Sequence, residues 1–241
     1  PAGIAAGMIL LASVPGGTMS NIYTLFARGN IALSISLTSI TTVAALLMSP
    51  LILQVLLAQY LPDDFNMPTG RIAMDIFGAL ILTLLIGMWI RHRFDPRTAV
   101  RISKWSIRLS LLAIVVMVVG ASGSGRLDPE AYGLSGIGAL VLFFLLVQAV
   151  VLLAGRVTGM GRQDTVAVLI EAGYRNVSLA VAIKAVVFPA QSGVLDPIGD
   201  AVLFTIFIYG GISMVLALVP VFVNRRLTPP EESAAVLKMP S

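Results

Sequence analysis

The chain has 241 residues, of which 57% are hydrophobic and only 12% are charged. Soluble globular domains carry about twice that fraction of charged residues, so the composition predicts a protein of the lipid bilayer. The lack of cysteine excludes disulfides, thiolate metal sites and cysteine nucleophiles. A single histidine, His92, argues against a histidine-rich zinc site or haem ligation.

A helix needs about 20 apolar residues to cross the hydrocarbon core, because each residue adds about 1.5 Å. Runs with few or no charges predict seven spans, which cover residues 1–27, 29–62, 72–90, 109–125, 131–155, 165–188 and 201–224. Short loops rich in proline, glycine and charge separate these spans. The chain starts inside an apolar run and without an initiator methionine, so we expect a piece of a longer protein that lacks upstream spans.

The distribution of lysine and arginine predicts the orientation. Alternate loops on one side carry most of the basic residues: Arg28, Arg91, Arg93, Arg97, Arg101, Lys104, Arg156, Arg162, Arg225 and Arg226. That side is predicted to be cytoplasmic, with residues 225–241 as a disordered cytoplasmic tail of a multi-pass protein of the plasma (inner) membrane. The net charge of +4 therefore needs no nucleic acid to explain it, and no obligate protein partner is evident.

Two of the seven spans are interrupted. In the first span, Pro15-Gly16-Gly17 lies mid-run, where proline removes a backbone donor and glycine weakens helical order. In the sixth span, Glu171-Ala172-Gly173-Tyr174-Arg175-Asn176 places an acid, a base and an amide at membrane depth. Irregular backbone persists in a membrane only where it is buried in protein or lines a watery cavity, and its freed carbonyls can coordinate an ion.

Each interruption also has a purely structural interpretation. The two glycines of the first span could form a surface for close helix packing, with Pro15 as a simple kink. Glu171 and Arg175 have i,i+4 spacing and could neutralise each other as a structural ion pair. Against this, each interrupted span is followed by one further span, at 30–49 and 197–223. Interrupted helices at matching places in two halves predict an inverted-repeat transporter.

The motifs Pro15-Gly16-Gly17-Thr18-Met19-Ser20-Asn21 and Glu171-Ala172-Gly173-Tyr174-Arg175-Asn176 resemble the two crossing helices of the bile acid:sodium symporter (BASS) family, and residues 27–39 resemble its following turn and helix. The resemblance implies an all-α membrane protein with an inverted-repeat secondary transporter fold and two discontinuous crossing helices. Of the ten spans of that fold, this chain would hold the last seven. A core domain, here 1–60 and 132–224, would move against a panel represented by 69–122.

The resemblance also implies a sodium site. Its oxygen ligands would be Ser20, Asn21, Ser34, Thr38 and Glu171. Ser34 and Thr38 lie one turn apart on one helical face, and hydroxyl, amide and carboxylate oxygens suit a hard monovalent cation. The alternative is that these hydroxyls bond their own helix backbone, as serine and threonine often do in membrane helices.

A second sodium site of the family would use Glu171 again, the carbonyls of Ala172 and Tyr174, and a glutamine in place of which this chain has Arg175. A guanidinium offers only donors and cannot ligate sodium, so the sequence predicts one Na⁺ site and argues against the second. Arg175 is then either a tethered positive charge that replaces one cation or a bidentate grip on a substrate carboxylate. Lys184, near the outer end of the second interrupted span, is expected to reach the membrane surface.

The predicted function is therefore sodium-coupled symport of a small organic anion by alternating access, with substrate-binding candidates Thr18, Asn21, Arg175 and Asn176. The alternative is a sodium-independent or proton-coupled organic anion permease of the same fold, in which Arg175 replaces one cation. An enzyme is not predicted, because no H-E-x-x-H or G-x-S-x-G motif is present.

Overall fold

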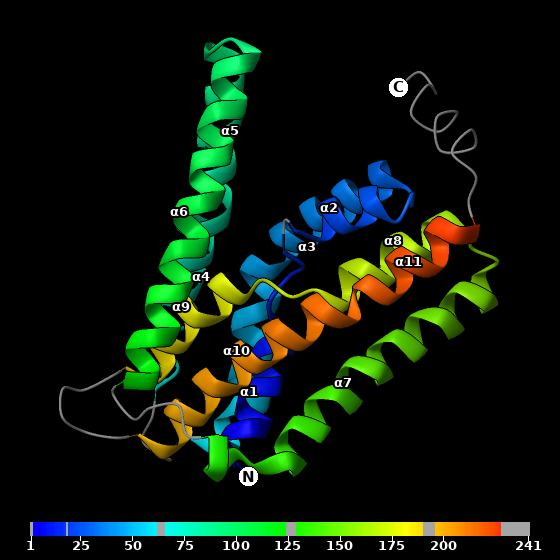
Figure 1. Cartoon of the computed structure of the whole chain (residues 1–241). Helices are drawn as coiled ribbons and strands as arrows, with labels where there is room; N and C mark the ends of the chain where they lie inside the picture. The colour runs from blue at the N-terminus through cyan, green and yellow to red at the C-terminus, as the bar shows by residue number, and fades with distance from the viewer. Residues whose placement is uncertain (1, 18, 62–65, 124–128, 190–195, 228–241) are drawn as a thin grey trace.

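The computed structural model describes residues 2–17, 19–61, 66–123, 129–189 and 196–227. These residues are almost entirely helical, as the sequence predicts (Figure 1). The elements are α1 (Ala2–Ser13), α2 (Met19–Phe26), α3 (Ile31–Ile52), η1 (Leu53–Leu57), η2 (Ala58–Tyr60), α4 (Thr69–Ile76), η3 (Phe77–Leu82), α5 (Thr83–Arg93), α6 (Pro96–Gly123), α7 (Pro129–Thr158), α8 (Arg162–Gly173), α9 (Val177–Val187), α10 (Pro197–Leu216) and α11 (Leu218–Leu227).

Four continuous helical stretches among these residues are long and apolar enough to cross a bilayer: Ile31–Tyr60, Thr69–Arg93, Tyr132–Thr158 and Pro197–Leu227. The first and sixth predicted spans are instead pairs of shorter helices, α1 with α2 and α8 with α9. The stretch that begins with α3 changes pitch at the π-helical turn η1, just after Pro50. Because proline removes a backbone donor, the hydrogen bonding of the helix has to adjust at that point.

The connection between the third and fourth predicted spans is a tight turn rather than a basic loop. α5 ends at Arg93 and α6 begins at Pro96, well before the predicted span at 109–125. Asp95 starts α6, because its carboxylate accepts a hydrogen bond from the Thr98 amide at 3.0 Å. Hydrogen bonds from the Thr98 side chain and amide lower the pKa of Asp95. Hydropathy locates the apolar part of a helix and not its ends, which is why the sequence misplaced this boundary.

The last helix extends past its predicted end. α11 continues to Leu227, three residues into the segment 225–241 that the sequence predicts as a tail, and residues 228–241 lie outside the described part. The Arg162 guanidinium donates to the Leu227 carbonyl at 2.8 Å, and that of Arg28 donates to the Arg225 carbonyl at 3.4 Å. Cationic groups at a helix C-terminus satisfy free carbonyls and favour its dipole, so they support this last turn.

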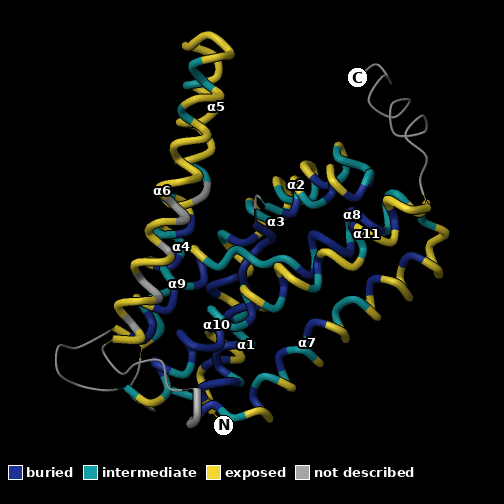
Figure 2. The backbone as a smooth tube through the Cα atoms, in the orientation of Figure 1, coloured by how far each residue is buried: buried dark blue, intermediate teal, exposed yellow. Residues whose placement is uncertain are grey.

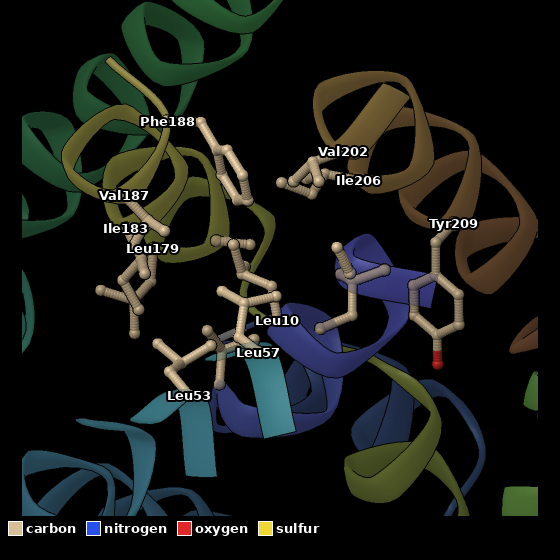
Figure 3. Packing of buried hydrophobic residues seen from close by; sticks show 14 of the residues in the cluster. Leu10, Leu53, Leu57, Leu179, Ile183, Val187, Phe188, Val202, Ile206 and Tyr209 are labelled. Carbon is tan, nitrogen blue, oxygen red and sulfur yellow. The ribbon is translucent and has the colours of Figure 1, made fainter. Parts of the chain in front are cut away.

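The packed core lies where α1, η1, α9 and α10 meet. Figure 3 shows Leu10 of α1, Leu53 and Leu57 of η1, Ile183 of α9 and Ile206 of α10 in one buried cluster, each without exposed surface. Figure 2 shows that buried segments concentrate around this region, whereas the α5–α6 hairpin is largely exposed. The core therefore holds the two interrupted helices in place, and the hairpin stands apart from it.

Lys184 belongs to this core. Only 5% of its surface is exposed, so the prediction that it reaches the membrane surface is wrong. It shares a helical face of α9 with the buried Ala180, Ile183 and Val187, and α9 packs against α1, α4 and α10. The helical period of that buried face, and not the position of Lys184 near a helix end, decides where the side chain lies.

Candidate cation site

The two interrupted helices meet at their breaks. The Gly17 amide donates to the Tyr174 carbonyl at 3.2 Å, and the Asn176 amide donates to the Pro15 carbonyl at 3.0 Å. These bonds join the breaks as a short antiparallel bridge. Backbone groups that leave one helix thus find partners in the other, as buried peptide groups must in a membrane.

The glycines of the first break allow this close approach. A Cβ atom at Gly16 would overlap the Glu171 carboxylate, and one at Gly17 would lie 2.9 Å from the Tyr174 ring. Both glycines lie outside the helices and against the opposite break. The two glycines therefore do permit close packing, but between the two breaks and not between two continuous helices.

The five predicted sodium ligands form one connected group, which we call the oxygen cluster. The Ser20 hydroxyl donates to Glu171 Oε2 at 2.5 Å, and Thr38 Oγ1 lies 2.9 Å from both carboxylate oxygens. The Ser34 hydroxyl donates to Asn21 Oδ1 at 2.7 Å. Since Thr38 Oγ1 also lies 3.4 Å from Asn21 Oδ1, the two halves of the cluster are joined.

Three helices build the oxygen cluster: Ser20 and Asn21 come from α2, Ser34 and Thr38 from α3, and Glu171 from α8. Ser20 and Ser34 have no exposed surface and Glu171 has 5%, so the charge lies inside the protein. A buried carboxylate needs charge or hydrogen-bond partners, and in the described part of the chain its hydrogen-bond partners are the hydroxyls of Ser20 and Thr38. Rotated hydroxyls, the amide oxygen and the carboxylate together offer the all-oxygen environment that a hard cation prefers.

The two backbone positions predicted for a second site lie at the break itself. In a continuous helix the Asn176 amide would bond the Ala172 carbonyl, but it donates to Pro15 instead. The Tyr174 carbonyl accepts the Gly17 amide, which occupies one of its two lone pairs. Ala172 therefore offers a carbonyl released from its helical partner, and Tyr174 offers one that is partly engaged.

Arg175 turns away from Glu171. Its Nη1 donates to the Val14 carbonyl of the first break at 3.4 Å, and its side chain also interacts with that of Tyr209, whose hydroxyl donates to the Gly173 carbonyl at 2.9 Å. In the described part of the chain Glu171 and Arg175 form no ion pair, and the buried Nε of Arg175 has no hydrogen-bond partner. The structural ion pair is therefore wrong, because α8 ends at Gly173 and i,i+4 geometry does not reach Arg175.

The four substrate-binding candidates are placed differently. Thr18 lies outside the described residues. Asn21 belongs to the oxygen cluster, and Arg175 and Asn176 lie in the second break. The Asn176 side chain accepts the Leu179 amide at 3.0 Å and so caps α9, which leaves its amide group as the part able to meet a ligand.

Three further residues, which the sequence does not predict, lie around the site. The Ser34 hydroxyl lies 3.3 Å from Thr24 Oγ1, and Thr24 is fully buried. The Gln148 amide of α7 donates to the Leu169 carbonyl of α8 at 3.1 Å. Tyr209, on α10, is the third. Thr24 carried a weak signal because it lies one turn after Ser20 on α2, whereas Gln148 and Tyr209 stand on continuous helices without any motif.

A sequence profile of the Sodium Bile acid symporter family matches residues 1–124. The chain belongs to this family. The match covers the first break, α2 and α3, and these two helices carry four of the five residues of the oxygen cluster. Glu171, the fifth, lies beyond the matched residues.

Relatives of the family align along most of the chain. The Sodium-dependent organic anion transporter of Rattus norvegicus is 30% identical over 191 residues, which cover 78% of this chain and 50% of the rat protein. The Uncharacterized sodium-dependent transporter YocS of Bacillus subtilis is 28% identical over 194 residues, 80% of this chain and 59% of its own length. The Sodium/bile acid cotransporter 4 of Homo sapiens is 29% identical over 200 residues, 78% of this chain and 43% of its own.

The chain thus spans about half the length of the curated relatives it matches. The family and these relatives are transporters and not enzymes, in agreement with the prediction from sequence. Together with the four long apolar helical stretches of the described residues, family membership identifies an integral, multi-pass membrane protein.

Proposed function

We propose that this member of the sodium bile acid symporter family carries out sodium-coupled symport of a small organic anion. The observation that carries the proposal is the oxygen cluster, in which a buried carboxylate meets oxygens of two other helices beside the paired breaks. Relatives named sodium-dependent transporters, including an organic anion transporter, support the coupling ion and the substrate class.

Ion binding would act on the position of the helices. Ser20 and Asn21 of α2, Ser34 and Thr38 of α3, and Glu171 of α8 replace the hydration shell of Na⁺ only when the three helices are close together. The Glu171 charge draws the cation in, and the cation in turn cancels a charge that would repel an anion. The oxygen cluster thereby couples cation binding to the admission of an anion, as alternating access requires.

The anion would bind on the other side of the bridge between the breaks. Arg175 and Asn176 offer N–H donors there, Asn21 approaches from the oxygen cluster, and Thr18 follows the first break. The N-terminus of α9 begins at the same place, and a helix N-terminus attracts negative charge. Guanidinium and amide donors are the groups that recognise a carboxylate or sulfonate.

The architecture that we propose is an inverted repeat. Its support is the matching order of the two broken helices: α1 and α8 have 12 residues each, and the following helices α3 and α10 have 22 and 20. The core domain would comprise 1–60 and 132–224, and the panel 69–122. The predicted cytoplasmic side and a plasma (inner) membrane location complete the proposal.

Arg175 sets the proposed ion stoichiometry at one Na⁺. Its guanidinium donates to a carbonyl of the first break, so a fixed positive charge stands where released carbonyls would otherwise attract a second cation. The same observation favours a second candidate function, a sodium-independent or proton-coupled permease in which Arg175 replaces the cation and Glu171 exchanges a proton.

The test is uptake of labelled organic anions, from bile acids to short carboxylates, by proteoliposomes that contain the full-length protein. We expect an inward Na⁺ gradient to drive uptake. Glu171→Gln should lower the apparent Na⁺ affinity by about a hundredfold or more, because a unit charge at contact distance contributes several kcal/mol even at high effective dielectric. Asp95→Asn removes a carboxylate of the α5–α6 turn, keeps its helix cap and should change nothing.

Replacing sodium by other ions in the same uptake assay separates the two candidate functions. Uptake that persists when choline replaces sodium and follows a pH gradient would select the permease. Uptake that responds to neither gradient, or a Glu171→Gln variant with unchanged sodium dependence, contradicts the proposed site.

A further inference from the structure

The turn between α5 and α6 concentrates positive charge. Residues 91–108, which we call the basic hairpin, contain six of the sixteen lysines and arginines of the chain and a single carboxylate, Asp95. The six basic residues are Arg91, Arg93, Arg97, Arg101, Lys104 and Arg108. Asp95 caps α6 and keeps its charge, so six basic residues against one carboxylate leave the segment a net charge of +5 with His92 neutral.

These charges are free to meet a ligand. All six side chains are exposed, and within the described residues none of them forms an ion pair or a hydrogen bond. The other turns of the same predicted side differ, because Arg28 and Arg162 there donate to the carbonyls at the end of α11.

Four of the basic residues form a stripe on α6. Arg97, Arg101, Lys104 and Arg108 are spaced at i, i+4, i+7 and i+11, which places them on one helical face. α5 runs antiparallel beside this part of α6, and its neighbouring residues 84–90 carry no charge. None of the four basic residues lines the space between α5 and α6, so the stripe lies on the face of α6 that points away from α5.

Both tryptophans of the chain lie on the two helices of the hairpin, Trp89 on α5 and Trp105 on α6 beside the stripe. The Arg108 guanidinium lies 5.3 Å from the centre of the Trp105 ring, and Trp89 packs edge-on against Phe94 at 6.2 Å in the turn. Exposed tryptophans of membrane proteins gather at the level of the lipid headgroups. The stripe therefore lies at the depth where phosphate groups are found.

A groove of about 640 Å³ opens between the two helices. Its lining includes Gly87, Ile90 and Arg91 of α5 and Val100, Ser103 and Ser106 of α6. Guanidinium and hydroxyl donors suit a phosphate, and the apolar residues beside them suit an acyl chain. Free phosphate would contact only the guanidinium and hydroxyl donors, whereas a phospholipid would contact these donors and the apolar residues.

We propose that the basic hairpin binds anionic phospholipids of the bilayer. One lipid lies in the groove, with its phosphate at Arg91 and Ser103 and an acyl chain along Ile90 and Val100, and the basic stripe on the other face of α6 holds the headgroups of neighbouring lipids. Clusters of four to eight basic residues beside a membrane span attract anionic lipids, and basic pockets between helices hold their headgroups. An acidic protein segment would match the charge but not the apolar wall of the groove.

The test uses the fluorescence of Trp89 and Trp105, which report from the site itself. The full chain is placed in phosphatidylcholine nanodiscs that contain either brominated phosphatidylglycerol or brominated phosphatidylcholine at equal mole fraction. We expect an apparent preference of about fivefold for the anionic lipid, the effect of roughly one engaged basic side chain. Raising the salt concentration should reduce this preference, because the charges are exposed.

A matched pair of variants separates the basic hairpin from general positive charge. Arg91→Gln/Arg101→Gln/Lys104→Gln removes charge from the groove and from the stripe and should abolish the preference, whereas Arg91→Lys/Arg101→Lys should keep it and show that the hairpin still folds. Arg156→Gln/Arg225→Gln/Arg226→Gln removes the same charge from exposed positions of the same predicted side and should have no effect. Equal quenching by both lipids in the unchanged chain, or a preference that survives the first substitution, overturns the proposal. A tryptophan response to soluble polyglutamate in place of lipid also overturns it, in favour of an acidic protein partner.

Discussion

The two broken helices contribute different things to the crossing. The break between α1 and α2 is neutral, and donors from elsewhere satisfy its backbone; the Ser49 hydroxyl of α3, for example, donates to the Ser13 carbonyl at 2.6 Å. The break between α8 and α9 carries charges at its two ends, on Glu171 and Arg175. The first break thus provides room for a close approach and a hydrogen-bonded backbone, whereas the second break provides the charged side chains.

The difference explains how one crossing keeps two opposite charges apart. Glu171 lies in the last turns of α8 and faces hydroxyls of α2 and α3, whereas Arg175 lies past the helix end and faces the Val14 carbonyl. A direct ion pair would neutralise both groups. Their separation leaves a carboxylate able to meet a cation and a guanidinium able to meet an anion.

The largest effect on this division of roles is expected from a side chain added to the neutral break between α1 and α2. Gly16→Ala places a methyl group into the Glu171 carboxylate, so the carboxylate has to move out of the oxygen cluster. Overpacking of this kind costs about 1–3 kcal/mol, and we expect a loss of up to about a hundredfold in apparent Na⁺ affinity for uptake. The measurement is anion uptake as a function of sodium concentration.

The control is a glycine with free space around it. Gly211 lies exposed on α10, and nothing stands within 4 Å of a Cβ built there. Gly211→Ala should leave uptake unchanged and stabilise the helix slightly. A Gly16→Ala variant that binds sodium as the unchanged protein does would show that the neutral break has no role in placing Glu171.

Arg175→Gln tests the charged break. If the guanidinium stands in for a second cation, its removal should raise the Hill coefficient for sodium from about one towards two in the full-length protein, because the coefficient is limited by the number of sites. The apparent affinity for the anion should fall by about tenfold or more, because a charge-assisted hydrogen bond to the anion is lost as well. Unchanged sodium dependence with a collapsed anion affinity would instead assign Arg175 to the substrate carboxylate.

The sequence sufficed to predict the features that interrupt a pattern. Proline, glycine and charge within apolar runs located both breaks, and the family resemblance then selected five residues that the structure brings together. The sequence also misplaced helix boundaries where hydropathy was the only guide. Arg97 and Lys104 were assigned to a loop because charge ends a hydropathic run, although α6 is helical through both.

Contacts across the chain were beyond such reasoning. Tyr209 bonds the Gly173 carbonyl, and Gln148 bonds that of Leu169, from helices that show no interruption. Nothing in the local sequence indicates which residue of a long apolar helix faces a break. The rejected Glu171–Arg175 ion pair failed for a related reason, because its spacing assumes a continuous helix through a segment that is not helical.

The smallest predicted effect tests whether the Ser34 hydroxyl of α3 takes part in cation binding together with Glu171. Ser34 donates to Asn21, whereas Ser39 donates to the Ile35 carbonyl of its own helix at 2.8 Å and is exposed. Ser34→Ala removes one neutral ligand and should lower the apparent Na⁺ affinity about three- to tenfold, the range of a single hydrogen-bonding group. Ser39→Ala makes the same chemical change outside the oxygen cluster and should have no effect. Equal behaviour of the two variants would mean that the Ser34 hydroxyl is not a ligand, so that α3 would contribute Thr38 alone.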